Sequence, residues 1–489
     1  MVKKIFISLW MAGTVSFSHA TSYYISPTGN NTNKGTSKDF PKASLANVQH
    51  LVKPGDIVYI LPGTYLVDKN EVMDKASSTV WDIIYDFAVS GTEKDPIAYR
   101  GIVDSDGNRP VFDLSNVSTG KRLTGFYIHA NYLQFSNLEV LGITVPKSSS
   151  NTQSENFRIN GGSHCTFENI AAHDGMGIGF YLTGKSAYNV LTNCDAYNNF
   201  DSNNIEVNNG GNSDGFGCHV NTNCPGNKFI FCRAWQNSDD GFDFINCYSP
   251  ATAKYCIAYR NGYDKEGNKR ADGNGFKAGG YGMKKAINIS EVPMHVVSHC
   301  LSVANKANGF YTNHHLGGVK MEYNSAYKNG KYNFSFVNRR GASINDAIDV
   351  NGYGHVIEHN LSYGTANIGT HIDTNSCTIN GNSFIYVYES WSNENFSDGD
   401  FISLSAKQLI ASRDPYGNLP SITFMQLKDD GKDYGYGSFK NSPQTSINNI
   451  KSTPTRQQTY YTLTGMPVKH PLSGNIYIKD GKKLIFQGK

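Results

Sequence analysis

Residues 193–199 read Asn-Cys-Asp-Ala-Tyr-Asn-Asn, and variants of this stretch recur along the chain. Aligned on its cysteine, the copies share a first column made of Ile170, Cys194, Cys232, Cys256, Cys300, Asn324 and Asn360. The steps between these residues are 24, 38, 24, 44, 24 and 36, so the base period is 24 and the longer steps contain insertions. A fixed period of this length is typical of architectures in which each repeat packs against its neighbours.

Three further columns accompany the first. Small residues stand two places later, at Ala172, Ala196, Ala234, Ala258, Ser302, Ala326 and Ser362. The next place is mostly aromatic, with His173, Tyr197, Trp235, Tyr259, Val303, Tyr327 and Tyr363. Asparagine recurs five places after the first column, at Asn199, Asn237, Asn261, Asn305 and Asn329. A coil of this length holds three short strands and three turns, so we predict an all-β parallel β-helix with coils about 4.8 Å apart and an asparagine ladder at one turn.

The composition agrees with many short strands and turns. Among 489 residues there are 49 glycines and 12% aromatic residues, whereas charged residues are only 17%, against about 25% in an average chain. The aromatic content and the net charge of +3 argue against disorder. The 44 basic and 41 acidic residues are spread along the chain, which argues against a nucleic-acid partner.

The N-terminus has the pattern of an export signal. Lys3 and Lys4 precede an apolar run over residues 5–17, and Ser18-His19-Ala20 supplies the small residues of a cleavage site. Thirteen residues are too few to span a bilayer, and no later stretch approaches the length required. We therefore expect a signal peptide over residues 1–20 and a protein without a membrane span that is secreted, periplasmic or held at the cell surface.

The expected domain organisation is a β-helix domain over residues 21–445, followed by a linker and a small β-rich tail over residues 446–489. Residues 42–53 have the pattern of a short amphipathic helix that would cap the N-terminal end of the stack. The cysteines of the first column are expected to be buried and unbridged. A disulfide between Cys218 and Cys224 stays open at this point.

A second set of columns follows a repeated Gly-Phe pair. The segments are Asp214-Gly-Phe-Gly217, Asp240-Gly-Phe-Asp243, Asn274-Gly-Phe-Lys277 and Asn308-Gly-Phe-Tyr311. In two of these coils, insertions of 12 and 10 residues come just before the turn. Stacking then gathers the four carboxylates of Asp214, Asp239, Asp240 and Asp243. Such a cluster needs a cation, and an all-oxygen ligand set favours Ca²⁺; the alternative is that these are solvated aspartates of ordinary Asp-Gly turns.

Lys277 lies one coil above Asp243 in this alignment. One interpretation is an ion pair at the surface. The other is a base, because a nearby divalent cation disfavours the charged form of lysine and lowers its pKa. A neutral amine could take the C5 proton of a uronate, after which the C4–O4 bond would break by β-elimination.

These motifs resemble polysaccharide lyase family 9, a family of right-handed parallel β-helix pectate lyases. The likeness rests on Asn212-Ser-Asp-Gly-Phe-Gly217, Asn237-Ser-Asp-Asp-Gly-Phe-Asp-Phe244 and Gly273-Asn-Gly-Phe-Lys277, with similar opening and closing segments at residues 23–65 and 419–427. The resemblance implies Ca²⁺ ligation by the four aspartates and a base role for Lys277. The tail from about Tyr460 resembles the C-terminal sorting tails of secreted Bacteroidetes proteins.

The resemblance also implies a substrate class, the acidic plant cell-wall polysaccharide pectin, and it leaves polygalacturonate and rhamnogalacturonan I as alternatives. Specificity is expected in the loops at residues 201–212, 262–272 and 281–293. Arg339, Arg340 and Tyr311 are candidate substrate contacts, although the two arginines could equally be ordinary surface residues. We expect a monomer.

Two rival functions remain at the level of sequence. A polygalacturonase-like hydrolase would use two of the aspartates as acid and base, but the Gly-His-Gly and Arg-x-Lys motifs of those enzymes are missing from this sequence. A non-catalytic, polysaccharide-binding β-helix would need only the aromatic columns.

Overall fold

The computed structural model describes residues 20–73, 80–150, 152–280, 292–340, 348–365, 369–387 and 390–428, with a few positions and short strands beyond them. The predicted signal peptide and most of the loop at residues 281–293 lie outside the described residues. The chain divides into two compact units, residues 1–440 and 441–489. In the second unit, β35 (Tyr460–Tyr461), β36 (Pro467–Val468), β37 (Ile476–Lys479) and β38 (Lys482–Ile485) form an antiparallel sheet.

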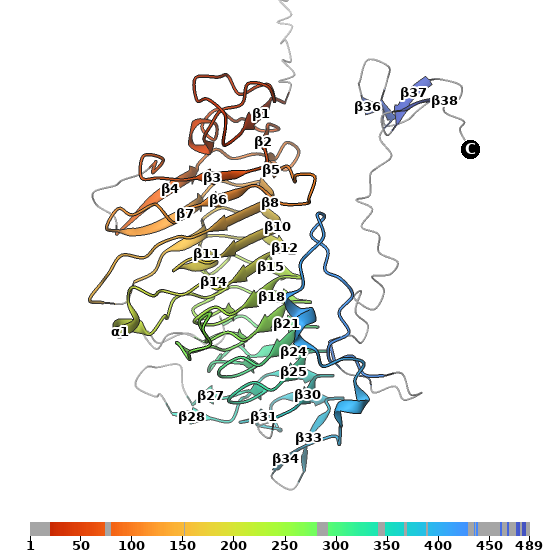
Figure 1. Cartoon of the computed structure of the whole chain (residues 1–489). Coiled ribbons are helices and arrows are strands. Elements are labelled where there is room, and N and C mark those ends of the chain that lie inside the picture. Colours follow the sequence, from red (N-terminus) through yellow and green to blue (C-terminus); the bar gives the residue numbers. More distant parts are fainter. Residues whose placement is uncertain are drawn as a thin grey trace, which may run out of the picture. The chain divides into compact units, whose positions relative to one another are not determined.

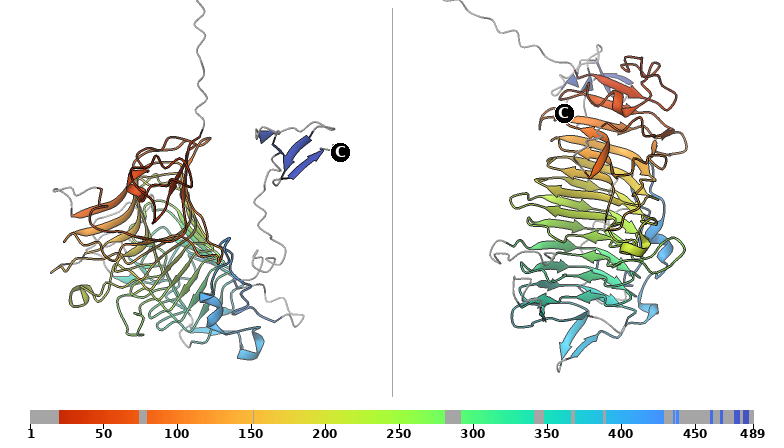
Figure 2. Two further views of the ribbon diagram at one scale, coloured as in Figure 1. Left: turned by 45° about the horizontal axis from the view of Figure 1, so that its top comes forward. Right: turned by 90° about the vertical axis from the view of Figure 1, so that its left-hand side faces the viewer.

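The first unit is a parallel β-helix, as predicted (Figure 1). A typical coil consists of β14 (Phe216–Val220), β15 (Asn227–Ile230) and β16 (Arg233–Trp235), after which β17 (Phe242–Asp243) pairs in parallel with β14. Three strands per coil are therefore confirmed. Strands of successive coils lie one above another in the side view (Figure 2).

The strands form three columns. The first column contains β1 (Ser22–Ile25), β2 (Ile57–Ile60), β5 (Ile97–Gly101), β12 (Val190–Thr192), β15, β18 (Ala251–Lys254), β21 (His295–Ser298), β24 (Val319–Glu322), β29 (Val356–Glu358) and β32 (Thr378–Asn380). The second contains β3 (Thr64–Leu66), β6 (Val111–Asp113), β13 (Asp195–Tyr197), β16, β19 (Ile257–Tyr259), β22 (Leu301–Val303), β25 (Ser325–Tyr327) and β30 (Leu361–Tyr363). The long strands β8 (Leu133–Leu141) and β10 (Thr166–His173) run through both columns and join them into one sheet.

The third column forms a sheet of its own. It contains β4 (Trp81–Phe87), β7 (Arg122–Ile128), β9 (Glu155–Asn160), β11 (Ile178–Gly184), β14, β17, β20 (Phe276–Lys277), β23 (Phe310–Tyr311), β26 (Phe334–Ser335) and β31 (Gly369–Thr370). The Gly-Phe segments named in the sequence analysis stand at the start of β14, β17, β20 and β23.

A stack of phenylalanines fills the core behind the third column. The rings of Phe157, Phe180, Phe216, Phe242, Phe276, Phe310 and Phe334 follow one another with centroid separations between 4.7 and 5.1 Å. This spacing is that of neighbouring strands, because each ring comes from the same position of the next coil. The repeated Gly-Phe segments therefore stack in register.

The predicted asparagine ladder is also present, and it is buried. In each step the Oδ1 atom of one asparagine accepts hydrogen bonds from the backbone N–H and the side-chain amide of the asparagine one coil before it, as Asn261 does for Asn237 at 3.2 and 3.0 Å. The side-chain amide of Asn261 donates in turn to the carbonyl of Ala234 at 3.0 Å. At this turn the buried asparagine of one coil thus has its polar groups satisfied by the neighbouring coils.

Replacing Asn261 with alanine is expected to lower the free energy of unfolding by about 1–3 kcal/mol or more, because the backbone N–H and the amide of Asn237 would lose their acceptor inside the protein. Chemical denaturation of the variant measures this loss. Asn375 is exposed and serves as the control; equal stabilities for the two alanine variants would contradict the importance of the ladder.

The prediction of a capping helix over residues 42–53 is wrong in type and length. The structure has one 3-10 turn, η1 (Leu45–Asn47), capped by the Ser44 side chain, which accepts from the backbone N–H of Ala46. Lys42 forms a parallel bridge with Ile25, so the start of the segment is extended rather than helical. Leu45, together with Val48 and Val52 beyond the turn, nevertheless joins the hydrophobic core.

All nine cysteines lie in described parts of the chain, and all are free. The possible Cys218–Cys224 disulfide is not formed. Cys218 is buried on β14, and its Sγ atom lies 3.7 Å from that of Cys247 in the next coil.

The last long described segment of the first unit, residues 401–428, is called the C-terminal strap here. It follows η4 (Asp398–Asp400) and contains η5 (Ala406–Ile410). Its apolar residues Phe401, Leu409, Ile422, Phe424 and Met425 form a second core cluster with residues of the second strand column, which are Ile257, Leu301, Val303, Tyr327 and Leu361.

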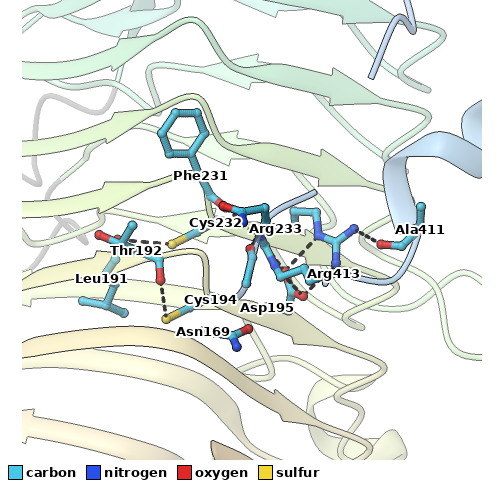
Figure 3. A network of polar contacts seen from close by, with 12 residues as sticks. Asn169, Leu191, Thr192, Cys194, Asp195, Phe231, Cys232, Arg233, Ala411 and Arg413 are labelled. Carbon is cyan, nitrogen blue, oxygen red and sulfur yellow. Dashed lines mark hydrogen bonds and ion pairs between the residues drawn. The ribbon is translucent and has the colours of Figure 1, made fainter. Parts of the chain in front are cut away.

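A buried ion network also ties the strap to the coils (Figure 3). Asp195 of β13 receives two hydrogen bonds from Arg233 of β16, at 2.9 and 2.7 Å, and two from Arg413 of the strap, at 3.0 and 2.8 Å. Arg233 also donates to the strap carbonyls of Leu409 and Ala411.

Within the described residues, no helix is long and apolar enough to cross a membrane.

Candidate active site

The site begins where the glycine column lets neighbouring coils come close. A Cβ atom on Gly215 or Gly241 would lie only 2.7 or 2.6 Å from the carbonyl oxygen of the glycine in the next coil, so a larger residue does not fit. This close approach places the residue before each glycine directly over the residue at the same position of the neighbouring coil. In this chain those residues are Asp214, Asp240, Asn274 and Asn308.

These four side chains form a second ladder in which Oδ1 of one residue accepts from the following coil, the reverse of the asparagine ladder, and aspartate occupies two of its positions. Oδ1 of Asp214 accepts from the backbone N–H of Asp240 at 3.0 Å, and Oδ1 of Asp240 accepts from both the backbone N–H and the amide of Asn274, at 2.6 and 2.9 Å. In an aspartate, however, the second side-chain atom is an acceptor instead of a donor. Oδ2 of Asp240 is accordingly buried without a hydrogen-bond partner.

The next column carries Gly217, Asp243, Lys277 and Tyr311, which occupy matched positions in β14, β17, β20 and β23. The predicted register is therefore the observed one. Lys277 Nζ lies 3.1 Å from Asp240 Oδ2 and 3.2 Å from Asp243 Oδ2. Only 11% of the Lys277 side chain is exposed, so the interpretation as a surface ion pair does not describe it.

Asp239 connects the cluster to two of the three predicted specificity loops, those at residues 201–212 and 262–272. Its Oδ2 atom accepts from the backbone N–H of Asn212, and its Oδ1 atom accepts from that of Asp272, at 2.9 and 3.0 Å. The first of these loops contains the short helix α1 (Ile205–Asn208). Because each insertion ends on one oxygen of Asp239, this residue holds both loops beside the carboxylates.

Burial and mutual repulsion shift the titration of the cluster. Burial raises the pKa of Asp214 well above its ordinary value, and the charges of Asp239, Asp243 and Asp240 add to this effect. Burial also raises the pKa of Asp239 to about 6 and that of Asp240 to about 8, against the opposing effect of Lys277. The ammonium group of Lys277 therefore does not fully compensate the negative charge of the carboxylates.

Lys277 responds in the opposite sense. Burial alone would lower the pKa of its ammonium group, but the four aspartates outweigh this effect and hold the pKa well above its usual value. The reduced pKa expected for a base thus requires that the carboxylate charge is first compensated.

The donor set suits a hard divalent cation. Carboxylate oxygens of Asp214, Asp240 and Asp243 lie within 4.8 Å of one another, and all three residues are buried, which excludes solvated turn aspartates. Oδ2 of Asp240 is buried, accepts no hydrogen bond and has the Lys277 ammonium at 3.1 Å, so it is an oxygen that such an ion could coordinate. The predicted ligands form two overlapping groups rather than one, since Asp239 groups with Asp240 and Asp272.

Two residues near the cluster escaped the sequence analysis. Asp272 is 69% exposed, and its Oδ2 atom lies 3.6 Å from Lys277 Nζ. His219 Nε2 lies 3.9 Å from Asp243 Oδ1, and burial lowers the pKa of this histidine. His219 stands two residues after Gly217 on the same strand, so the alternation of a strand could have placed it on the same face.

The candidate substrate residues lie beyond Lys277. Tyr311 is half-buried in the register position above Lys277, and burial raises its pKa to about 12. Arg339 lies on β27 (Asn338–Arg339), which pairs with β28 (Asp349–Val350), and Arg340 follows it at the surface. The structure thus brings the four aspartates and Lys277 together, with Tyr311 beside them, and leaves the two arginines on a separate hairpin.

Fold and site define a parallel β-helix protein with a carboxylate-rich centre on one strand column. Residues 23–345 match the family model described as "Pel9A-like, right handed beta helix region", and the chain belongs to this family. The predicted resemblance and the right-handed fold are thereby confirmed.

Individual relatives agree with this assignment. The chain is 30% identical to pectate lyase L of Dickeya dadantii (strain 3937) over 415 residues, which is 84% of each chain. A solved rhamnogalacturonan lyase structure superposes with a TM-score of 0.79 at 38% identity, covering 86% of this chain and 100% of that one. The crystal structure of pectate lyase Pel9A gives a TM-score of 0.64 at 28% identity, covering 85% of this chain and 91% of that one.

Proposed function

We propose that this protein is a Ca²⁺-dependent pectic polysaccharide lyase that cleaves a galacturonate-containing backbone by β-elimination. The observation that carries the proposal is the placement of Lys277 Nζ at 3.1–3.2 Å from two buried aspartates of a carboxylate cluster. Membership of a family with pectate lyase and rhamnogalacturonan lyase relatives supports the reaction class.

The aspartates Asp214, Asp239, Asp240 and Asp243 would hold the cation. A bound Ca²⁺ would supply positive charge that stabilises the anion developing at the substrate carboxylate. The same charge would offset that of the aspartates, which otherwise keeps the pKa of Lys277 high.

Lys277 then acts as the base. Its neutral amine takes the C5 proton, which is acidic because C5 is α to the uronate carboxylate. The electron pair left on C5 forms the C4–C5 double bond as the C4–O4 bond breaks. O4 leaves as an alkoxide that takes a proton from the solvent, to which Lys277 later returns the proton that it took. The products are a shortened chain and a 4,5-unsaturated uronate, and no water is consumed.

The substrate we propose is pectin, outside the cell that makes the enzyme. Both polygalacturonate and the rhamnogalacturonan I backbone contain galacturonate and could use this centre. The sequence pattern of a signal peptide at residues 1–20 supports export, and one copy of the chain contains every residue of the proposed centre.

The direct test is to assay the purified protein on polygalacturonate and on rhamnogalacturonan I side by side. Lysis produces a conjugated uronate that absorbs in the ultraviolet, and we expect this signal on at least one polymer. New reducing ends without the absorbance would indicate a hydrolase, and binding without any product would indicate a non-catalytic protein.

Removing the cation with a chelator is expected to abolish product formation, and added Ca²⁺ should restore it.

Calorimetric titration should show Ca²⁺ binding to the wild type and at least about tenfold weaker binding to Asp240→Asn, since that change replaces a charged ligand. Because the pKa values of Asp239 and Asp240 are about 6 and about 8, binding should release protons and strengthen as the pH rises through this range. Equal affinity for the two proteins would contradict the assigned ligands.

A further inference from the structure

The outward face of the third strand column continues well beyond the carboxylate cluster. Five residues occupy one register row across successive strands: Lys277, Asp243, Gly217, Tyr181 and Arg158. At a strand spacing of about 4.8 Å, Arg158 lies four coils, or about 19 Å, from Lys277 along the stack. All five residues belong to the same face, because register partners in parallel strands point the same way.

Tyr181 makes this face continuous with the cluster. Its ring lies over Gly217, where a Cβ atom would come within 2.9 Å of Tyr181 Cδ2, so the glycine leaves room for the ring. The Tyr181 hydroxyl lies 3.3 Å from His219 Nδ1, and the other nitrogen of His219 lies 3.9 Å from Asp243. No side chain therefore rises from Gly217 to separate the cluster from Tyr181.

Arg158 is held in a fixed orientation at the far end of this row. Its guanidinium lies over two rings, 4.6 Å from the centre of Trp81 and 5.4 Å from that of Tyr181. Glu155 accepts from Nη1 at 2.8 Å, and the same carboxylate also accepts from Thr124 and Gln153. Nε of Arg158 is buried without a hydrogen-bond partner, so the donors of this guanidinium are incompletely used.

This arrangement suits a sugar carboxylate. Planar guanidinium groups recognise carboxylates through paired hydrogen bonds, and flanking aromatic rings reduce the entropy lost when the side chain is immobilised. We propose that Arg158, with Trp81 and Tyr181, forms a distal subsite that binds a uronate carboxylate of the polymer, several sugars from the bond that Lys277 cleaves. The proposal rests on the proposed lyase function and adds a place where the length of the substrate is sensed.

The test uses Arg158→Gln and a length series of oligosaccharides from whichever backbone the wild type cleaves. We expect kcat/KM to fall at least about tenfold on long oligosaccharides and polymer, mainly through KM, as for the loss of a charge-assisted hydrogen bond. Short oligosaccharides that do not reach four coils should be cleaved as by the wild type. Arg158→Lys should recover part of the loss.

The matched control is Arg100→Gln, since Arg100 is an exposed arginine of β5 in the first strand column. Unchanged kcat/KM on long substrates, or an equal loss on short and long ones, would overturn the subsite, because the second result indicates a purely structural role.

A second readout separates this proposal from the proposed function. In the Lys277→Ala background, oligogalacturonates should quench the fluorescence of Trp81, and Arg158→Gln should weaken that response. If the wild type forms no product on any uronate polymer, the lyase proposal fails, while the titration still decides whether a uronate binds here. An equal fluorescence response in Lys277→Ala and in the double variant Lys277→Ala/Arg158→Gln would overturn the subsite.

Discussion

Lys277→Ala is expected to lower kcat by about 10²–10⁴-fold, the range contributed by a positioned general base. The variant loses the amine that lies at 3.1–3.2 Å from Asp240 and Asp243, which is the group proposed to take the C5 proton. The rate of ultraviolet absorbance increase on the preferred polymer measures this effect. Polymer binding should persist, because the aspartates are unchanged.

Two controls make this result specific. Lys277→Arg keeps the positive charge but cannot release a proton near neutral pH, so it should be as inactive as the alanine variant. Lys228→Ala removes an exposed lysine of β15 and should leave the rate unchanged. Activity of Lys277→Ala within about tenfold of the wild type would rule out the base role, since even the weakest general bases contribute more.

The second large effect concerns stability. Asp195→Ala is expected to lower the free energy of unfolding by about 3–5 kcal/mol, because it leaves two buried arginines without their carboxylate. Burial raises the pKa of Asp195, but Arg233 and Arg413 outweigh that effect and hold it well below its usual range. The charge is therefore present at neutral pH, and denaturant unfolding there measures its full contribution.

Comparison variants separate the parts of this network. Arg413→Met should cost less than Asp195→Ala, because Arg233 still pairs with Asp195, but it should expose the strap to limited proteolysis. Asp106→Ala, at an exposed turn, should change stability by no more than about 0.5 kcal/mol. If Asp195→Ala is as stable as Asp106→Ala, the buried ion network does not stabilise the protein.

The sequence predicted the features that repeat. The coil period, the asparagine ladder, the Gly-Phe column and the register of Asp243 with Lys277 all follow from spacing, because stacking turns equal spacing into contact. The location of the candidate site follows in the same way, since two insertions precede the same turn.

Features without a period were missed or mistaken. Asp272 lies in an insertion, where no register rule applies, and only its contact with Lys277 reveals it. The helix expected at residues 42–53 fails because Lys42 pairs with Ile25, a contact that helical periodicity does not encode. Arg413 binds Asp195, which lies 218 residues away in the sequence, and no local sequence pattern predicts this contact.

The C-terminal strap changes how a stack of this kind should come apart. In a simple solenoid each coil touches only its neighbours, so the ends can fray while the middle stays folded. Here one segment contacts Asp195 of β13 and also Leu361 of β30, far along the same column. Peeling coils from the C-terminal end would first have to detach the strap, so unfolding between these two strands should be cooperative. The carboxylate centre lies within the same stretch of coils, and it should therefore be lost in one transition rather than gradually.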